Sequence, residues 1–266
     1  MKIWQQSLAV IEKLPTYERI LDEHAKRVCS PGTEVHLHGL DPESYAGATT
    51  PIEVLVFPWA FRLATIQIVE NGLRAQEEGY DVFCLSTFAD PGIDDLRSML
   101  DIPVASIFET SLLMASLTSR TPALFALNPT HIQMVRRMLA SKAVGSIVGG
   151  VYSMPRPIIE PDMNDDRIEI VIGEFEEAAR GAIADGADLL IPAEGLLNTL
   201  LSHGRVEEVD GIPVQDSYAA TLCFAEMMDR LKRSGGLGIS PNQTLGRADS
   251  TSVEHLRRAA SKALGR

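Results

Sequence analysis

The sequence predicts an α/β fold of two pseudo-symmetric, doubly wound parallel-sheet domains, with the active site expected in the cleft between them. Short apolar runs of strand length alternate with longer amphipathic stretches, as in parallel strands joined by helices. The chain also repeats a unit that opens with Gly-x-Asp and later contains Ile-Pro-Val, first at 79–104 and again at 186–214. Two related units would each offer one strand-end turn to a shared cleft.

The expected strands are short apolar segments bounded by polar or turn-forming residues. They are Lys2–Trp4, Glu34–His38, Val54–Phe57, Val82–Ser86, Val104–Ile107, Ala123–Leu127, Gly145–Val151, Leu189–Ile191 and Val214. Amphipathic helices are expected at Thr16–Val28, Phe61–Glu78 and Gly173–Ala184. Because ligands in such folds bind beyond the carboxyl ends of the strands, the residues after each strand are the candidates for chemistry.

The repeat divides the chain into two domains and a tail. We expect a first α/β domain at 1–116 plus 217–233, and a second at 117–216. Residues 234–250 are rich in Gly, Ser, Pro and Asn, which is typical of a linker, and a short basic helix is expected at 253–266. This helix either docks on a neighbouring subunit or frays.

Charge and cysteine content narrow the function classes. The net charge of −12 argues against non-specific binding to nucleic acid and to anionic membrane surfaces. Cys29, Cys84 and Cys223 form no C-x-x-C or zinc pattern, which indicates reduced thiols in a cytoplasmic protein. No apolar run is long enough for a membrane span, and the first residues lack the pattern of a signal peptide. Since no nucleotide-binding pattern or metal-ligand set is present, we expect no cofactor and no metal.

Two strand-end turns carry the candidate catalytic residues. The segment LSTFADPG places Thr87 directly after a buried strand, and GADLLIPAEGLL places Glu194 among apolar neighbours. A carboxyl group in such surroundings has a raised pKa and becomes a usable acid or base. A threonine hydroxyl can donate a hydrogen bond, or attack a carbonyl if a neighbour takes its proton. The structural alternatives are a solvated loop carboxylate or a helix N-terminal residue for Glu194, and a helix N-cap or turn residue for Thr87.

These two segments resemble the aspartate/glutamate racemase superfamily, most closely its hydantoin racemase branch, and the resemblance covers roughly residues 1–233. It implies two pseudo-symmetric α/β domains, no cofactor, and one cysteine after each of two strands to move the proton alpha to a carbonyl. Here Thr87 stands at the first cysteine position. Glu194 stands at the second in an ungapped reading, and Ala193 does if the reading shifts by one residue. The two-thiol mechanism is therefore not expected.

Other residues near the expected strand ends are candidates for substrate binding. Side-chain amides can bind carboxylate or ring carbonyl groups, and backbone N–H groups at a helix start can hold an anion. The resemblance places the helix after the first Ile-Pro-Val segment near substrate. The candidates are Gln5, Gln6, Ser86, Phe88, Thr110, Ser111, Asn128, Thr130, Tyr152 and Gly195. Several of them also fit an ordinary cap, turn or core role.

Together these features predict a cofactor-independent enzyme for a small carbonyl or carboxylate compound, or a cyclic amide. Glu194 would move a proton, while Thr87 orients the substrate or stabilises an oxyanion. Isomerase or lyase chemistry is favoured, because the resembling family stabilises enolates. Hydrolysis of an amide or lactam by the same pair, and a protein that binds a small molecule without turnover, are the alternatives. We expect a homo-oligomer with no nucleic-acid or membrane partner.

Overall fold

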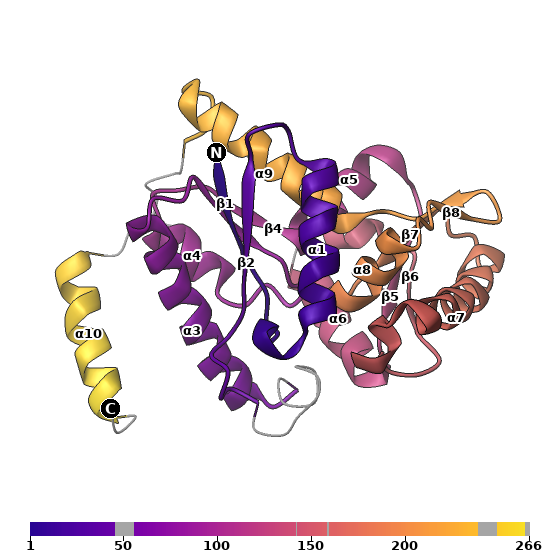
Figure 1. Ribbon diagram of the computed structural model, residues 1–266, viewed down its shortest axis with the longest axis horizontal. Helices are drawn as coiled ribbons and strands as arrows, with labels where there is room; N and C mark the ends of the chain where they lie inside the picture. The colour runs from indigo at the N-terminus through magenta and orange to yellow at the C-terminus, as the bar shows by residue number, and fades with distance from the viewer. Residues whose placement is uncertain (46–55, 142, 159, 239–248, 264–266) are drawn as a thin grey trace.

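The computed structural model describes residues 1–45, 56–141, 143–158, 160–238 and 249–263. Two parallel sheets lie side by side within these residues (Figure 1). The first has the order β2-β1-β3-β4 and the second β6-β5-β7. Their strands are β1 (Lys2–Gln6), β2 (Glu34–His38), β3 (Val82–Leu85), β4 (Val104–Ser106), β5 (Pro122–Ala126), β6 (Gly150–Ser153) and β7 (Leu189–Pro192).

Helices follow the strands and cover the sheets (Figure 1). They are α1 (Pro15–Val28), α3 (Pro58–Glu77), α4 (Ile93–Met99), α5 (Ile107–Thr118), α6 (Pro129–Ser141), α7 (Asp165–Ala184), α8 (Gly195–His203) and α9 (Ser217–Arg233). A last helix, α10 (Ser250–Ala263), lies apart from both sheets (Figure 1). A small antiparallel hairpin, β8 (Glu208–Val209) and β9 (Ile212–Pro213), leads into α9. The α/β class and the parallel sheets are those that the sequence predicts.

The internal repeat is visible in the topology of the two sheets. Val214 pairs in parallel with Leu190 of β7, and so takes the place that β4 has beside β3. The second half then repeats the strand order of the first, with β5, β6 and β7 in the roles of β1, β2 and β3. The segments β3-α4-β4-α5 and β7-α8-Val214-α9 are the two copies.

The repeated Gly-x-Asp has the same structural role in both halves. Gly79 and Gly186 end α3 and α7 with positive φ angles of 78° and 97°, a conformation that favours glycine. The aspartate two residues later then fastens the next strand to its neighbour. Asp81 accepts a hydrogen bond from the Lys2 N–H, 2.7 Å, and Asp188 accepts one from the Thr121 N–H, 2.9 Å. The motif therefore sets where each central strand starts.

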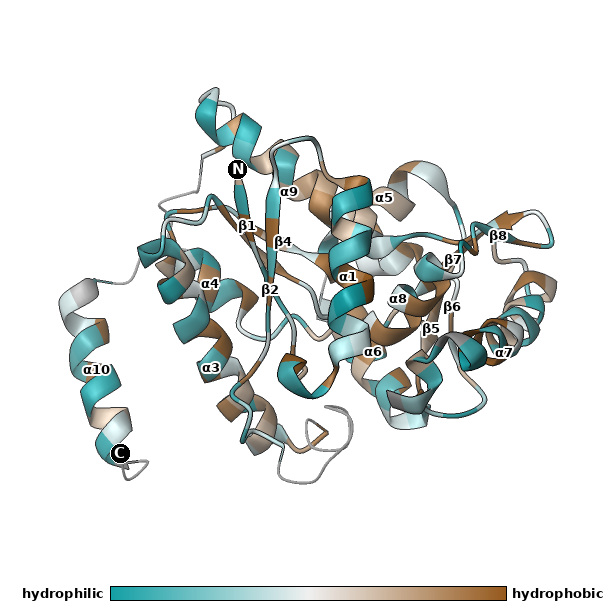
Figure 2. Cartoon of the chain, in the orientation of Figure 1, coloured by the Kyte–Doolittle hydropathy of each residue, from teal (hydrophilic) through white to brown (hydrophobic). Residues whose placement is uncertain are grey.

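Alternation along the strands sorts the core of the first half onto two faces. Ile3 and Val82 pack on the face covered by α1 and α9, whereas Trp4 and Phe83 pack on the face covered by α3 and α4. Hydrophobic residues gather in this way on the strands, while the outward side of α1 is hydrophilic (Figure 2). A sheet covered on both faces fits the doubly wound prediction.

The two halves exchange helices. Helix α9, from the end of the second copy, packs on β3 and β4 of the first sheet, and its Leu222 and Ala225 share a core with Ile3 and Cys84. Helix α1 packs on α8, and its Ile20 belongs to the core that surrounds the second sheet. This exchange supports our proposal that residues 217–233 belong with the first domain and 117–216 form the second.

Two expected strands differ from the structure. Part of Val54–Phe57 lies outside the described residues, and Val56 and Phe57 form a turn before α3 instead of a strand. Within Gly145–Val151 the chain first forms a 3₁₀ helix, Ala143–Ile147, and β6 starts only at Gly150. A Cβ on Gly145 would lie 2.1 Å from the Leu139 carbonyl oxygen, so the chain turns there in close contact with α6, which excludes an extended strand.

Beyond the linker, the described part of the tail is α10. It contacts the body through an ion pair between Arg257 and Glu70 of α3. Among the described residues, no helix has the length and apolar character that a membrane span requires.

The left-handed conformation of Gly186 gives a direct test of this fold. Gly186→Ala should lower the free energy of unfolding by about 1–2 kcal/mol, because an L-residue resists that backbone conformation. Gly181→Ala, in the helical part of α7, is the matched control, since an added Cβ at either position meets no atom within 4 Å. It should leave stability unchanged or raise it by up to about 1 kcal/mol. Equal effects in urea unfolding would contradict the assignment.

Candidate active site

Thr87 and Glu194 are structural counterparts in the two halves. Each is the second residue after its central strand, β3 or β7. The residue before each also bonds in the same way: the Ser86 N–H donates to the Gln6 carbonyl, 2.8 Å, and the Ala193 N–H donates to the Phe125 carbonyl, 2.9 Å. Glu194, and not Ala193, therefore matches Thr87 in the repeat.

A pair of buried tyrosines joins the two turns. The Tyr218 hydroxyl donates to the Ser86 carbonyl, 3.2 Å, just before Thr87, and lies 2.8 Å from the Tyr17 hydroxyl. On the other side, a Cβ added to Gly195 would lie 2.7 Å from Tyr218 Oη and 3.2 Å from Tyr17 Oη. Both turns thus contact one hydroxyl group, which brings the ends of β3 and β7 to the same place. Only glycine leaves room for the tyrosines at position 195.

The Glu194 carboxyl group has a pKa close to neutral pH. It caps α8 and accepts a hydrogen bond from the Leu197 N–H, 3.0 Å. Burial raises its pKa, while the N–H groups of Leu197, Leu196 and Gly195 lower it, and the result is a pKa of about 7. Desolvation therefore outweighs the helix N-terminus, and the group exchanges a proton in the range where a general acid or base is most effective.

Thr87 is half-buried and keeps a proton to donate. Its Oγ1 accepts a weak hydrogen bond from the Ala89 N–H, 3.4 Å, and its carbonyl accepts one from the Asp90 N–H, 3.2 Å. Within the described residues the hydroxyl proton has no acceptor. The first contact is the turn role considered from sequence, and it leaves the O–H of Thr87 available for a ligand.

The Asp-Pro-Gly turn fixes the position of Thr87. Asp90 and Gly92 have positive φ angles of 45° and 69°, so the chain reverses sharply before α4. The Ser106 hydroxyl, at the end of β4, donates to the Asp90 carboxylate, 2.6 Å, and itself accepts from the Glu109 N–H. The turn, β4 and the start of α5 are therefore held together.

The two glutamines after the first strand lie on opposite faces of the sheet. The Gln6 side chain is fully bonded: its Oε1 accepts from Trp4 and Asn71, and its Nε2 donates to the carbonyls of Ser7 and Gly39. Gln6 therefore has no polar atom left for substrate. Gln5 differs, because its buried Nε2 has no hydrogen-bond partner among the described residues. Of the two, Gln5 remains a candidate ligand.

Four further candidates are buried around the first turn. Phe88 packs into the core shared with Tyr218, and the Ser86 hydroxyl lies 3.7 Å from Cys84 Sγ. In α5, the Ser111 hydroxyl donates to the carbonyl of Ile107, 2.6 Å. Thr110 stands apart from these, because its buried Oγ1 has no partner in the described part of the chain. Thr110 is thus the member of this group with a free polar atom.

The candidates in the second half divide in the same way. Asn128 caps α6 by accepting from the His131 N–H, 2.9 Å. Tyr152 donates to Asp185, 3.0 Å, which precedes β7 at the end opposite Glu194, so its hydroxyl is not brought to the site. Thr130 is exposed and lines a cavity of about 540 Å³ that the first turn also borders. Its lining includes Phe61, Thr65, Ala89, Gly92, Thr130 and Met134.

Sequence reasoning missed the two tyrosines. The repeat contained a signal for one of them, since Tyr218 in Asp-Ser-Tyr matches Phe108 in Ser-Ile-Phe of the first copy. A tyrosine at a buried position where the other copy has phenylalanine needs a hydrogen-bond partner for its hydroxyl group. Such a difference between the two copies indicates a residue with a specific polar contact. Burial raises the pKa of Tyr17 to about 12 and raises that of Tyr218 well above its ordinary value, so both hydroxyl groups stay protonated. In the described residues no group of three or more His, Cys, Asp or Glu could hold a metal ion.

The raised pKa of Glu194 predicts a pH-dependent difference in stability. A carboxyl group that binds its proton more tightly when folded stabilises the protein fully below its unfolded pKa of about 4.5, and this contribution is lost as pH rises through about 7. Glu194→Gln keeps an acceptor for the Leu197 N–H but never ionises. Above pH 7, the free energy of unfolding of Glu194→Gln should exceed that of wild type by about 1–3 kcal/mol. This range is smaller than the pKa shift alone would give, because the side chain is partly exposed to solvent.

The measurement is urea unfolding of both proteins across this pH range. The advantage of Glu194→Gln should shrink towards zero at pH values below the unfolded pKa. Glu208→Gln, which removes an exposed carboxylate from β8, serves as the control and should follow wild type. A pH-independent difference would show that Glu194 does not titrate near neutrality.

The tyrosine pair gives a second prediction. Tyr218→Phe leaves the buried Ser86 carbonyl and the Tyr17 hydroxyl without their shared partner, and should lower the free energy of unfolding by about 1–3 kcal/mol. Tyr152→Phe removes a hydroxyl that bonds an exposed aspartate, and should change it by less than about 0.5 kcal/mol. Equal losses in the two variants, measured by denaturant unfolding, would refute a special role for the pair.

Comparison with known proteins agrees with the geometry. A family model described as Asp/Glu/Hydantoin racemase matches residues 16–225. A hydantoin racemase from Pseudomonas sp. (strain NS671) is 26% identical over 161 residues, and the match spans 60% of this chain and 62% of that relative. A hydantoin racemase from Paenarthrobacter aurescens is 25% identical over 62% of this chain and 69% of its own. The chain thus aligns with a little under two thirds of the first relative's length.

Solved structures extend the likeness in fold to nearly the whole chain. An allantoin racemase from Klebsiella pneumoniae superposes with a TM-score of 0.71 at 19% sequence identity, covering 94% of each chain. A glutamate racemase from Bacillus anthracis gives a TM-score of 0.56 at 14% identity, over 100% of this chain and 94% of that one. With the matched family model, the paired strand-end turns and the shared two-domain α/β fold, the chain belongs to the Asp/Glu/Hydantoin racemase family, on its hydantoin racemase-like branch.

Proposed function

We propose that this chain is an isomerase-type enzyme in which Glu194 moves a proton at the carbon next to a carbonyl group. The observation that carries the proposal is the carboxyl group with a pKa of about 7 at the end of β7, opposite a hydroxyl on the matching turn of β3. Since the thiol pair expected from the resemblance is replaced by Thr87 and Glu194, the two faces of the substrate meet different groups. One titrates near neutral pH and the other does not.

In the proposed reaction, ionised Glu194 takes the proton alpha to the carbonyl, and the electron pair moves onto the carbonyl oxygen to give an enolate. The free O–H of Thr87 donates a hydrogen bond to that oxygen and stabilises the developing charge. Protonated Glu194 then delivers the proton to a second position of the same compound, which gives the isomer. Return of the proton to the original carbon from the same face regenerates the substrate, with its alpha proton exchanged for one from solvent. The enzyme needs no external acid, oxidant or cofactor for this cycle.

The substrate class that we propose is a small cyclic amide or ureide, with a carbonyl next to a carbon that bears hydrogen. Two features of the chain support it. Its relatives act on hydantoins, and the structure leaves the Gln5 amide and the Thr110 hydroxyl buried without partners among the described residues. Amide and hydroxyl groups are the usual hydrogen-bond partners of ring N–H and C=O groups. Elimination and ring hydrolysis could begin from the same pair, so the test distinguishes them.

The test is solvent exchange followed by proton NMR in deuterated buffer. Wild-type protein is incubated with 5-substituted hydantoins, allantoin, free amino acids and unsaturated diacids. Uptake of deuterium at the alpha carbon without a new product supports isomerase chemistry. A ring-opened product would indicate hydrolysis, and a new alkene would indicate a lyase. Binding without exchange or product would contradict an enzyme.

Variants assign the roles of the two residues. Glu194→Gln should reduce exchange by at least about a hundredfold, the usual contribution of a positioned base. Thr87→Val should reduce it by about tenfold to a hundredfold, with Thr87→Ser recovering most of the rate. The wild-type rate should rise with pH and level off above about 7, because the base acts in its ionised form. A rate that falls through pH 7, or full activity in Glu194→Gln, would overturn the assignment.

A further inference from the structure

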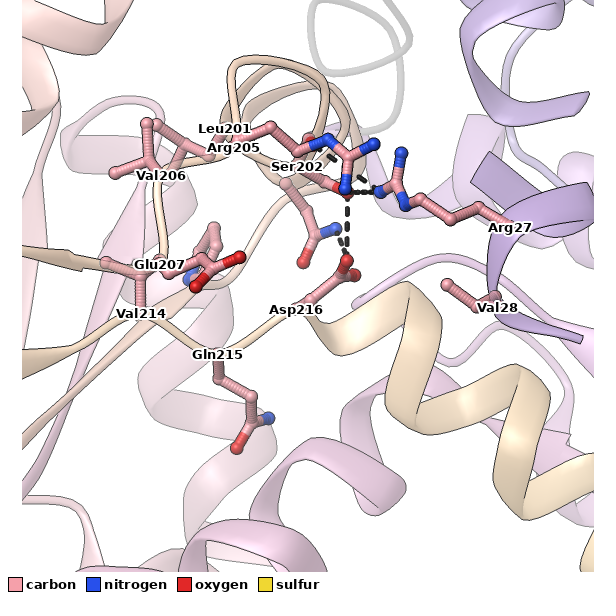
Figure 3. A pocket seen from close by; sticks show the side chains of 12 residues that line it. Arg27, Val28, Leu201, Ser202, Arg205, Val206, Glu207, Val214, Gln215 and Asp216 are labelled. Carbon is pink, nitrogen blue, oxygen red and sulfur yellow. Dashed lines mark hydrogen bonds between the residues drawn. The ribbon is translucent and has the colours of Figure 1, made fainter. Parts of the chain in front are cut away.

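A second cavity lies at the far end of α8 from Glu194. It measures about 180 Å³ and lies among α1, α8 and the turn that joins β9 to α9 (Figure 3). The residues of interest on its wall are Arg27, Ser202, Arg205, Glu207 and Asp216. Ligand sites for drug-sized molecules usually measure about 300–1,000 Å³, so this cavity suits a smaller compound.

Two arginines line this cavity without a carboxylate partner among the described residues. Within the described residues, Arg27 of α1 donates side-chain hydrogen bonds to Ser202 alone, 3.0 Å to Oγ and 3.5 Å to the carbonyl. Arg205, directly after α8, makes no ion pair within the described part of the chain. Figure 3 shows the two guanidinium groups turned toward one another beside Ser202. In a protein with a net charge of −12, two neighbouring arginines that form no ion pair in the described residues are a candidate site for an anionic group.

The backbone at Arg205 supports a role for its side chain. Arg205 adopts a positive φ of 57°, the position after a helix end where glycine is usual. The glycine of this segment, Gly204, stands one residue earlier and has an ordinary negative φ. A non-glycine residue in this conformation is less favourable than glycine, so Arg205 stands at this position despite a local backbone strain.

The two acidic residues on the cavity wall differ in whether their carboxylate oxygens already accept hydrogen bonds from the protein. Both oxygens of Asp216 are occupied: one accepts from the Ala219 N–H and Asn198, the other from His24 and Ser202. Glu207 is different, since its carboxylate pairs with neither arginine and with no other cation in the described residues. Figure 3 shows it turned into the same space. Charges of both signs thus line one small cavity without pairing.

We propose that this cavity binds a small zwitterionic amino acid. Arg27 and Arg205 take its carboxylate, and Glu207 takes its ammonium group. A zwitterion bridges charges that the protein leaves apart, whereas a simple anion would face Glu207 and a simple cation would face both arginines. The site is separate from Glu194 and Thr87, and it does not depend on the function proposed for them.

Three matched probes test the proposal: alanine, propionate and ethylamine. Propionate lacks the amino group of alanine, and ethylamine lacks the carboxylate. Isothermal titration of the full chain should show alanine binding at least about tenfold tighter than either analogue, because each loses one charge-assisted contact. Propionate binding as tightly as alanine, or no binding of alanine, would overturn the proposal.

Variants locate the binding. Arg27→Gln, Arg205→Gln and Glu207→Gln each change an exposed side chain and should weaken alanine at least about tenfold. Arg19→Gln removes a positive charge from the same helix, outside this cavity, and should leave binding unchanged. Glu194→Gln should also bind alanine as wild type does. If affinity falls only in Glu194→Gln, alanine occupies the candidate active site and the inference fails.

Discussion

The hydroxyl group of Tyr218 is the contact on which the arrangement of the candidate site depends. It lies on α9, which belongs to the second copy of the repeat but packs on the sheet of the first. From there it donates a hydrogen bond to the Ser86 carbonyl, just before Thr87. It also lies so close to Gly195, next to Glu194, that a larger residue would not fit at that position. Because the group is buried, every bond it makes is shielded from water, and a lost partner is not replaced. The geometry between the two turns is therefore set by a few specific contacts, and the core around them keeps it in place.

The ionisation of Glu194 results from two opposed effects of the same fold. A carboxylate at the first turn of a helix is normally favoured by the helix dipole and by free N–H groups, which alone would keep its pKa low. Here the tyrosines and the apolar residues around the turn remove water, and desolvation has the larger effect. The cap still matters, because it holds the carboxyl group in one orientation while burial sets its pKa. A capping role and an acid–base role are thus compatible at this residue.

Much of the fold follows from sequence because the decisive signals are local. Gly-x-Asp, Ile-Pro-Val and the strand-length apolar runs each specify a backbone conformation or a strand start, and Asp188 and Gly186 show how. The errors arise where tertiary contacts override the pattern: Gly145 sits against α6, so an apolar run that suits a strand becomes a 3₁₀ helix. For the candidate site, the sequence indicates the two turns that carry Thr87 and Glu194. It does not indicate the tyrosine hydroxyl groups that connect these turns. Gln6 followed a strand as expected, yet only the fold reveals that Trp4, Asn71 and Gly39 use its polar atoms.

The repeat also explains why the chemistry that we propose is one-sided. A fully symmetric repeat would place the same residue on both turns, as a two-thiol mechanism requires, but these two turns differ in backbone conformation and length. The first is a sharp Asp-Pro-Gly turn, with two left-handed residues before α4, and its Thr87 accepts a bond from its own turn. In the second, α8 begins directly after Glu194, so three N–H groups converge on that side chain. A helix start can orient a carboxylate, whereas the longer turn presents a hydroxyl whose oxygen accepts from the Ala89 N–H and whose proton has no acceptor among the described residues. The difference in turn length therefore matches the difference in side chain. It supports our proposal that proton transfer belongs to the second half and hydrogen-bond donation to the first.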